Sequence, residues 1–307
     1  MRQAAAAAAG GQHYPPGSLY VVATPIGNRA DMTLRAIHVL TLVDAIACED
    51  TRHSAALLRQ FGLDQPLMAV HQPNEREAAD AVMLRLARGE RVAYISDAGT
   101  PAISDPGAAL VDAVRAGAFR AIPIPGASSA AAALSVAGDA SGSAFTFIGF
   151  LPARGPQRAQ ALKQAAVDRR TQVVFEAPHR IDALADALAD ACAQSACADR
   201  RITVCRELTK QFETVETMPA SVLPGWLAAD ANRSRGEFVL VMHALAEAEA
   251  DSDASAQDSV LNVLMAELPL KQAVAIAASL TGVARNALYD RALVLKRDRE
   301  ALNSPPA

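Results

Sequence analysis

The chain has 307 residues, of which 51% are hydrophobic, and its formal net charge is −4. This length and apolar content suffice for a sizeable core divided over two or more domains. The negative net charge argues against a protein that coats nucleic acid indiscriminately. No apolar run approaches the roughly 18 residues needed to cross a bilayer, so we expect a cytoplasmic protein with no membrane partner.

Two segments have compositions typical of exposed chain. Residues 1–17 are rich in Ala and lack the long apolar stretch of a signal peptide, so we expect a disordered tail. Residues 246–258 contain acidic side chains but no Lys or Arg, which predicts an acidic linker exposed to solvent. The four cysteines lack zinc-ligand spacing, so we expect reduced thiols and no metal site.

Apolar runs and helical patterns alternate in the first half of the chain. The expected strands are residues 18–23, 43–48, 67–70, 92–96 and 121–124, and the expected helices are residues 34–42, 54–61, 75–88 and 107–116. Such alternation with short loops predicts βαβ units and a mainly parallel sheet. We therefore expect an α/β domain over residues 18–127.

The loops that follow these strands are rich in small residues. They read ATPIGN (residues 23–28), CEDTR (48–52), SDAGTPAISDPG (96–107) and PGASS (125–129). In parallel α/β sheets, ligands bind beyond the carboxyl ends of the strands. Any one loop could be an ordinary turn, but four such loops at one sheet edge indicate a binding site.

Past residue 128 the pattern changes to a second α/β domain, expected to end at residue 245. Its expected strands, which predict a mixed sheet, are residues 145–151, 171–177, 202–207, 211–218 and 236–242, with helices at 157–166 and 181–193. A small helical module is expected over residues 259–300, with helices at 269–280 and 284–296 in helix-turn-helix spacing. Val274, Ile276 and Ala277 should pack there on Leu288 and Leu293.

The familiar nucleotide and hydrolase motifs are missing. The sequence has no GxGxxG after its first strand, no GxxxxGK[ST], no HExxH and no GxSxG. The loops offer backbone groups and small side chains instead, which suit a ligand with a ribose, an adenine and an amino-acid tail. Pro106 and Gly107 could begin a helix whose free N–H groups face the same cleft.

The motifs TPIGN, EDTR, SDAGTPAISDPG, PGASS, FEAPHR and GEFVLV, in this order, resemble the tetrapyrrole methylase superfamily. The set is most similar to its members that 2′-O-methylate a cytidine of 16S rRNA, in the decoding region of the small ribosomal subunit. The resemblance covers about residues 18–242 and continues into the helical module. It implies two α/β domains of the tetrapyrrole-methylase type, S-adenosylmethionine in the cleft between them, a 16S rRNA partner and a homodimer.

The resemblance also implies residues that contact the cofactor. Carried over by motif, they are Pro25, Asp97, Ala98, Gly99, Thr100, Ile103, Ser128 and Ser129. Asp97 and Asp105 either tie down the long loop or bond the cofactor, and the sequence leaves both roles open.

Methylation of a ribose hydroxyl benefits from a group that accepts its proton. Candidates near the expected cleft are Asp50, Glu176 and His179, and candidates for RNA contact are Arg52, Arg154, Arg158, Arg180, Arg285 and Lys296. Structural ion pairs, Glu49 with Arg52 and Glu176 with Arg180, are the alternative reading.

Two other functions remain open at this point. A precorrin or uroporphyrinogen methylase could use the same fold, although EDTR, FEAPHR and the helical module disfavour it. A DNA-binding regulator that senses a metabolite is supported by the helix-turn-helix spacing alone.

Overall fold

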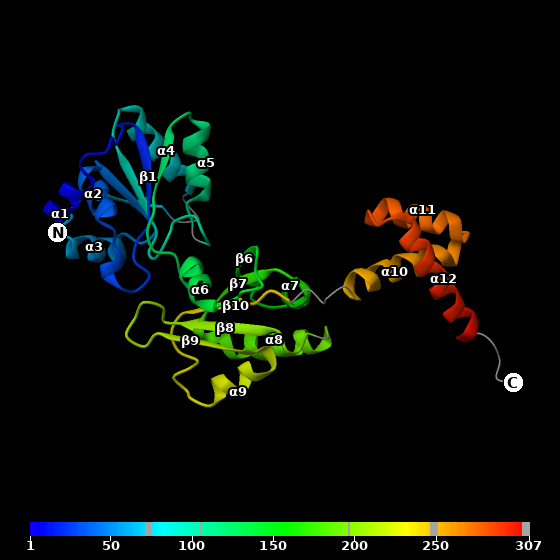
Figure 1. The fold of residues 1–307 in the computed structure, drawn as a ribbon. Coiled ribbons are helices and arrows are strands. Elements are labelled where there is room, and N and C mark those ends of the chain that lie inside the picture. Colours follow the sequence, from blue (N-terminus) through cyan, green and yellow to red (C-terminus); the bar gives the residue numbers. More distant parts are fainter. Residues whose placement is uncertain (71–74, 105, 196, 246–250, 303–307) are drawn as a thin grey trace. The chain divides into compact units, whose positions relative to one another are not determined.

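The computed structural model describes residues 1–70, 75–104, 106–195, 197–245 and 251–302. The chain divides into a body, residues 1–245, and a C-terminal unit, residues 246–307. The body contains two α/β domains, each built on its own sheet (Figure 1).

The first domain has a five-stranded parallel sheet in the order β3-β2-β4-β1-β5. Its strands are β1 (Ser18–Val22), β2 (Ala45–Cys48), β3 (Leu67–Ala69), β4 (Val92–Ile95) and β5 (Arg120–Ile124). Strands β2 and β4 are buried at every position, because helices cover both faces of the sheet. The parallel sheet expected from the sequence is confirmed.

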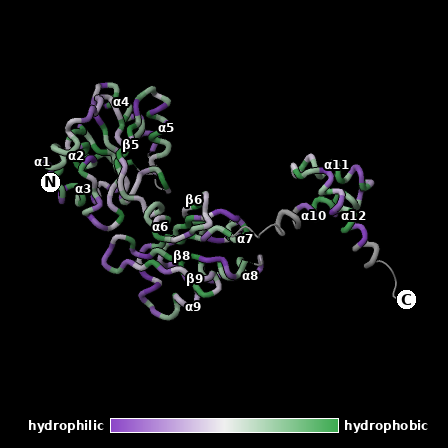
Figure 2. The backbone as a smooth tube through the Cα atoms, viewed as in Figure 1, coloured by the Kyte–Doolittle hydropathy of each residue, from purple (hydrophilic) through white to green (hydrophobic). Residues whose placement is uncertain are grey.

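The covering helices form two layers (Figure 1). The 3₁₀ turn η1 (Arg29–Asp31) precedes α2 (Leu34–Leu42), which packs with α3 (Thr51–Gln60) on one face; α4 (Glu75–Ala87) and α5 (Ala108–Ala116) pack on the other. The strands form a hydrophobic layer between these helices (Figure 2). Thr33 and Asp50 cap the N-termini of α2 and α3 with side-chain oxygens, so both helices begin where the polypeptide leaves a loop.

The expected disordered tail is wrong, because residues 1–17 contain helix α1 (Arg2–Ala9). Its Ala5 and Ala9 are buried, and α1 packs on α2. The Tyr14 hydroxyl then donates to the Ala9 carbonyl at 3.0 Å. Alanine has the highest helix propensity, and its small side chain allows close packing. The Ala-rich run is therefore a packed helix.

The second domain has a mixed sheet, as expected. Its strand order is β6-β7-β10-β8-β9. Only the β6–β7 pair is parallel among its strand pairs, and the others are antiparallel. The strands are β6 (Phe145–Phe150), β7 (Thr171–Glu176), β8 (Arg201–Arg206), β9 (Thr214–Pro219) and β10 (Phe238–Met242). Helix α6 (Ser129–Ala137), which the sequence did not predict, packs on one face.

The other face of this sheet carries the larger apolar core. It is covered by α7 (Pro156–Val167), α8 (Ile181–Gln194) and α9 (Leu223–Ala228), with the 3₁₀ turns η3 (Pro178–Arg180) and η4 (Ala220–Val222) beside them. Cys48, Cys192 and Cys205 are buried free thiols, and Cys197 is a half-buried free thiol. Burial raises the pKa of Cys205 to about 12, so this thiol is inert near neutral pH.

The C-terminal unit is built from α10 (Asp251–Glu267), α11 (Leu270–Thr281) and α12 (Arg285–Leu302). They share a core of Leu261, Val274, Ala277, Leu288 and Ala292. Contrary to expectation, Ile276 is exposed and Leu293 is half-buried outside this core.

The expected acidic linker needs a correction too. Residues 246–250 lie outside the described residues, but residues 251–258 begin α10 rather than forming a linker. Asp258 accepts a hydrogen bond from Arg291 Nε on α12 at 2.7 Å. Acidic side chains suit the first turns of a helix, where they complement its dipole, so this composition is compatible with α10. Among the described helices, none has the length and apolar character needed to cross a bilayer.

Candidate active site

A cavity of about 330 Å³ lies between the two domains of the body. The loops after β1 and β4 and the start of α6 form one wall, and the strand ends of the second domain form the other. The first wall is made of Ile26, Ala98, Gly99, Thr100, Ile103, Ser104, Ser128, Ser129 and Ala130. The second is made of Phe150, Phe175, Glu176, Ala177, Pro178, Cys205, Leu208, Glu237, Phe238 and Val239.

Backbone pairing fixes the first wall. The Thr24 and Gly99 amides each donate to the other's carbonyl, at 2.9 and 3.1 Å, which joins the loops after β1 and β4. The Thr100 hydroxyl donates to the Ala127 carbonyl at 3.1 Å. Gly99 has φ +82°, and a Cβ there would lie 3.3 Å from Ile26 Cγ2. The loop therefore presents backbone and small side chains to the cavity in a conformation that suits glycine.

Six of the eight residues expected to contact the cofactor line this cavity: Ala98, Gly99, Thr100, Ile103, Ser128 and Ser129. Pro25 and Asp97 are not among the described lining residues. Pro25 stands between Thr24, which pairs with Gly99, and the lining residue Ile26. Asp97 Oδ1 accepts from the Asp50 amide at 3.3 Å, so Asp97 ties two strand-exit loops together.

Contrary to expectation, the start of α5 does not face the cavity. The Gly107 amide donates to Glu75 Oε1 at 2.9 Å, and the Pro106 carbonyl accepts from the Tyr94 hydroxyl. Groups from α4 and β4 therefore bind the two residues before α5, and neither of these residues is among the described lining residues. Asp105 lies outside the described residues.

The structure gives Glu176 a structural role. Its side chain is fully buried, and both carboxylate oxygens have partners. Oε1 accepts from the Ala177 amide at 2.9 Å and pairs with Arg180, while Oε2 pairs with Arg158 at 3.2 Å. This is the ion-pair reading that the sequence left open, extended to a second arginine. We call Arg158, Glu176 and Arg180 the buried clamp.

The other two candidate bases lie away from the cavity lining. Asp50 caps α3, and the amides of Arg52 and His53 hold the pKa of its carboxyl below the usual value. His179 is an exposed residue of the turn η3. Neither belongs to the described lining residues, so the cavity does not bring the three candidate bases together.

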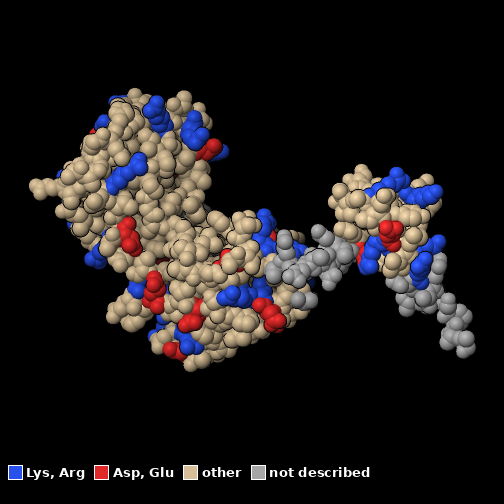
Figure 3. All heavy atoms as spheres, viewed as in Figure 1, with Lys and Arg blue, Asp and Glu red and all other residues tan. Residues whose placement is uncertain are grey.

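The candidate RNA contacts divide into two groups. Arg158 and Arg180 are committed to the buried clamp, with side chains 12% and 22% exposed. Arg52, Arg154, Arg285 and Lys296 are exposed. On the face shown in Figure 3, basic side chains are scattered over the body and the C-terminal unit.

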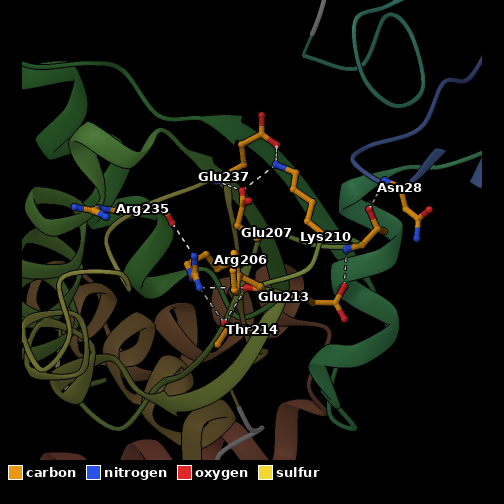
Figure 4. A network of polar contacts seen from close by, with 10 residues as sticks. Asn28, Arg206, Glu207, Lys210, Glu213, Thr214, Arg235 and Glu237 are labelled. Carbon is orange, nitrogen blue, oxygen red and sulfur yellow. Dashed lines mark hydrogen bonds and ion pairs between the residues drawn. The ribbon is translucent and has the colours of Figure 1, made fainter. Parts of the chain in front are cut away.

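Sequence reasoning missed a polar network beside the cavity (Figure 4). In the β8–β9 loop, Lys210 Nζ binds Glu207 Oε1 at 2.8 Å and Glu237 Oε2 at 2.9 Å. Thr209 Oγ1 in the same loop accepts from the Asn28 amide of the first domain at 3.0 Å. The network thus ties the β8–β9 loop to the first domain.

The network keeps Lys210 charged. Although burial by itself lowers it, the hydrogen bonds to Glu207 and Glu237 raise the pKa of Lys210 above its ordinary value. A protonated Lys210 cannot accept a proton. The spacing of Glu207 and Lys210, three residues apart, was the sequence signal available for this ion pair. Glu237 lies far along the chain, just before β10, so its contact with Lys210 could not be predicted from spacing.

Comparison with known proteins identifies the family of the chain. Residues 18–224 match the family model described as Tetrapyrrole (Corrin/Porphyrin) Methylases, and residues 250–296 match the RsmI C-terminal HTH domain. The chain belongs to the tetrapyrrole methylase family. A Pseudomonas aeruginosa relative named "Ribosomal RNA small subunit methyltransferase I" is 46% identical over 90% of this chain and 97% of its own length. A relative of the same name from Escherichia coli O157:H7 is 45% identical over 90% and 95%.

Solved tetrapyrrole methylases show the same fold. Cobalt precorrin-4 methyltransferase CbiF superposes with a TM-score of 0.56 at 16% identity, covering 75% of this chain and 98% of its own. Uroporphyrin-III-C-methyltransferase from Thermus thermophilus gives 0.53 at 18%, covering 74% and 94%. The expected fold class is confirmed, and so is the expected enzyme class, a methyltransferase that uses S-adenosylmethionine.

The cavity fits that cofactor. Gly99 leaves room beside the backbone of the long loop, and Ser129 and Ala130 bring the N-terminus of α6 into the wall. Free N–H groups at a helix N-terminus favour a carboxylate, such as that of the cofactor's amino-acid tail.

Proposed function

We propose that the protein transfers a methyl group from S-adenosylmethionine to the ribose 2′-oxygen of a cytidine in 16S rRNA, in the decoding region of the small ribosomal subunit. One observation carries the proposal: the similarity to relatives named for this class of enzyme extends over 90% of the chain. It includes a C-terminal unit with its own core, which a small-molecule methylase does not need.

The chain's own contribution is mainly positioning. The bound cofactor supplies an electrophilic methyl group, which must lie in line with the attacking oxygen. The Thr24–Gly99 pairing and the Thr100 bond to Ala127 hold the first wall in one geometry. The Asn28 amide donates to Thr209 Oγ1 in the β8–β9 loop, which the Lys210 ion pairs brace, and so links this loop to the first domain. Because the carboxylate of Glu176 is committed to the buried clamp, we assign no general-base role to it.

The exposed basic residues supply contacts to RNA phosphates. Arg154 follows β6 at the start of the α7 segment, and Arg285 and Lys296 lie on α12. Each phosphate contact releases counterions, so binding to ribosomal substrate should weaken as salt rises. We further propose that the enzyme acts in the cytoplasm as a homodimer, as the family resemblance implies.

Methyl transfer to defined acceptors tests the proposal. Purified protein would be given labelled S-adenosylmethionine with 30S subunits lacking the modification, naked 16S rRNA or uroporphyrinogen. We expect label in 16S rRNA and, after nuclease digestion, 2′-O-methylcytidine by mass spectrometry. Label in the porphyrinogen with none in either RNA acceptor would refute the proposal.

A further inference from the structure

An exposed aromatic ring lies in the wall of the cavity. Three phenylalanines in the described part of the chain are largely exposed: Phe145 at 58%, Phe150 at 53% and Phe212 at 68%. Of these three, Phe150 lines the cavity. A lining side chain with half of its surface in solvent stands where the cavity opens, so its ring meets whatever approaches from outside.

A β-bulge in β6 determines which face of the sheet the Phe150 ring lies on. In a regular strand, residues three apart point to opposite faces of the sheet. The pairing of β6 with β7 shifts between Phe147 and Gly149, which adds one residue. As a result Phe147 and Phe150 both contact Phe175, with ring centroids 5.1 and 5.7 Å apart and interplanar angles of 76° and 72°. Bulges commonly redirect a side chain beside an active site.

Glycine is required at the bulge. Gly149 has φ +68°, a region that side chains disfavour, and a Cβ there would lie 2.7 Å from Ser104 Oγ of the first wall. The bulge that orients Phe150 therefore also brings β6 against the cofactor loop.

The buried clamp holds the chain just after Phe150. Arg158 Nη1 donates to the Pro152 carbonyl at 3.0 Å, while Nη2 binds Glu176 at the end of β7. Glu176 follows Phe175, the ring that Phe150 contacts. The clamp thus fixes the exit of β6 on the strand that carries the supporting ring. Arg158, Glu176 and Arg180 are positioning residues for this edge of the cavity.

We propose that Phe150 is the platform on which the base of the target nucleotide stacks when its ribose enters the cavity. The inference rests on the proposed function. An enzyme acting on a ribose hydroxyl in folded RNA needs the nucleotide splayed from its neighbours, and exposed aromatic rings hold such bases by stacking. Arg154, exposed four residues beyond Phe150, is placed to meet an adjoining phosphate.

The adenine of the cofactor is the other base that could use this ring. The groups that fit the cofactor, the Gly99 loop and the N-terminus of α6, belong to the first wall. Phe150 belongs to the second wall and is half exposed, whereas Phe175 behind it is less exposed. The ring at the opening is therefore assigned to the substrate base.

Three variants of Phe150 and one matched control test this. Phe150→Ala removes the ring, Phe150→Leu keeps apolar volume without a flat face, and Phe150→Tyr keeps the face. Phe212→Ala removes a phenylalanine that is at least as exposed and lies outside the described cavity lining. For each variant, the thermal midpoint, the S-adenosylmethionine Kd by calorimetry, and KM and kcat with 30S subunits would be measured.

Base stacking on an aromatic ring accounts for roughly 5- to 150-fold in affinity by alanine substitution. We expect KM for 30S subunits to rise within that range in the Ala and Leu variants, with unchanged cofactor Kd. Phe150→Tyr and Phe212→Ala should behave as wild type. A rise in cofactor Kd by the same factor would assign the ring to the adenine, and wild-type kinetics in both the Ala and Leu variants would remove the platform altogether. Failure of the wild-type protein to methylate RNA would instead refute the proposed function, and this inference with it.

Discussion

The two walls of the cavity are built on different principles. The first wall presents mainly backbone and small side chains, Gly99 among them. The second wall presents large side chains, among them Phe150, Phe175 and Glu176. Its two carboxylates form ion pairs: Glu176 in the buried clamp and Glu237 with Lys210.

This difference distinguishes a wall that is suited to bind a ligand from a wall whose charged side chains stabilise the structure. A carboxylate at a strand end near a cavity is an attractive catalytic candidate, but a buried one must be paired, and in Glu176 the partners occupy both carboxylate oxygens. A wall of small residues needs no such pairing of buried charges, and it leaves space for a ligand beside its backbone. In this protein the first wall is the one suited to the cofactor.

The largest expected effect comes from breaking the buried clamp. Glu176→Ala leaves two arginines, 12% and 22% exposed, without their carboxylate. Removing one partner of a buried ion pair costs about 3–5 kcal/mol, and we expect the free energy of unfolding to fall by that amount in urea titrations.

Asp50→Ala is the matched control, because it removes a half-buried carboxylate that caps α3 and should destabilise the protein less than loss of the clamp. If Glu176→Ala were as stable as wild type yet inactive in methyl transfer, Glu176 would belong to the chemistry and the distinction between the walls would fail.

The next effect probes the first wall. Gly99→Val places a branched side chain against Ile26 in a backbone conformation that disfavours it. We expect S-adenosylmethionine Kd to rise by about 100-fold or more, together with a stability loss of about 1–3 kcal/mol from backbone strain. Calorimetric titration below the melting temperature measures the affinity. Unchanged affinity in the folded variant would place the cofactor elsewhere.

Removing the C-terminal unit should separate RNA affinity from cofactor affinity. A chain ending at Leu245 keeps both walls, and the core of the removed unit is built from its own helices. We expect KM for 30S subunits to rise about 10-fold and to depend less on salt, with cofactor Kd unchanged. Wild-type KM and salt dependence in the truncated protein would make the unit a packing element.

The smallest effect concerns a buried histidine in the second domain. His243 Nε2 lies 2.7 Å from Thr203 Oγ1. Burial lowers the pKa of His243, against the opposing effect of Asp139 and with help from Arg201 and Arg200. The unfolded chain therefore binds a proton at a higher pH than the folded one. The stability provided by neutral His243 is complete above about pH 6.5 and declines as pH falls below it.

One such proton changes the free energy of unfolding by at most about 1.4 kcal/mol per pH unit. Although burial by itself raises it, hydrogen bonds from Thr171 and the Ala244 amide lower the pKa of Asp139, so its stabilising effect is lost mainly below the pH range measured here. Urea titrations of wild type and His243→Gln between pH 7.5 and 5 should show a decline that the variant lacks. Parallel profiles would contradict this assignment.

The sequence predicted those parts of the fold that depend on local pattern. Alternating apolar runs predicted the strands of both sheets, and motifs carried over from the family resemblance predicted six of the residues that line the cavity. It failed where tertiary packing decides the outcome. The Ala-rich segment becomes α1 because α2 offers a surface for it, and residues 251–258 become helical as part of α10 in the three-helix unit.

The charged residues of the site were harder to interpret for the same reason. Arg158 and Glu176 are eighteen residues apart, and their pairing depends on how α7 packs beside β7. A glycine inside a strand pattern is the available signal for the bulge at Gly149, but the sequence does not show which face of the sheet Phe150 then takes. Both features require the three-dimensional arrangement of the second domain.

Complementation of a bacterial strain lacking its own ribosomal RNA small subunit methyltransferase I tests the central claim most directly. Mass spectrometry of 16S rRNA would compare the strain carrying this chain, the strain carrying its Gly99→Val variant, and the strain with an empty vector. The account predicts that one 2′-O-methylcytidine in the decoding region is restored by the wild-type chain and not by the variant. An identical 16S rRNA map in all three strains, with the wild-type chain expressed and folded, would contradict it.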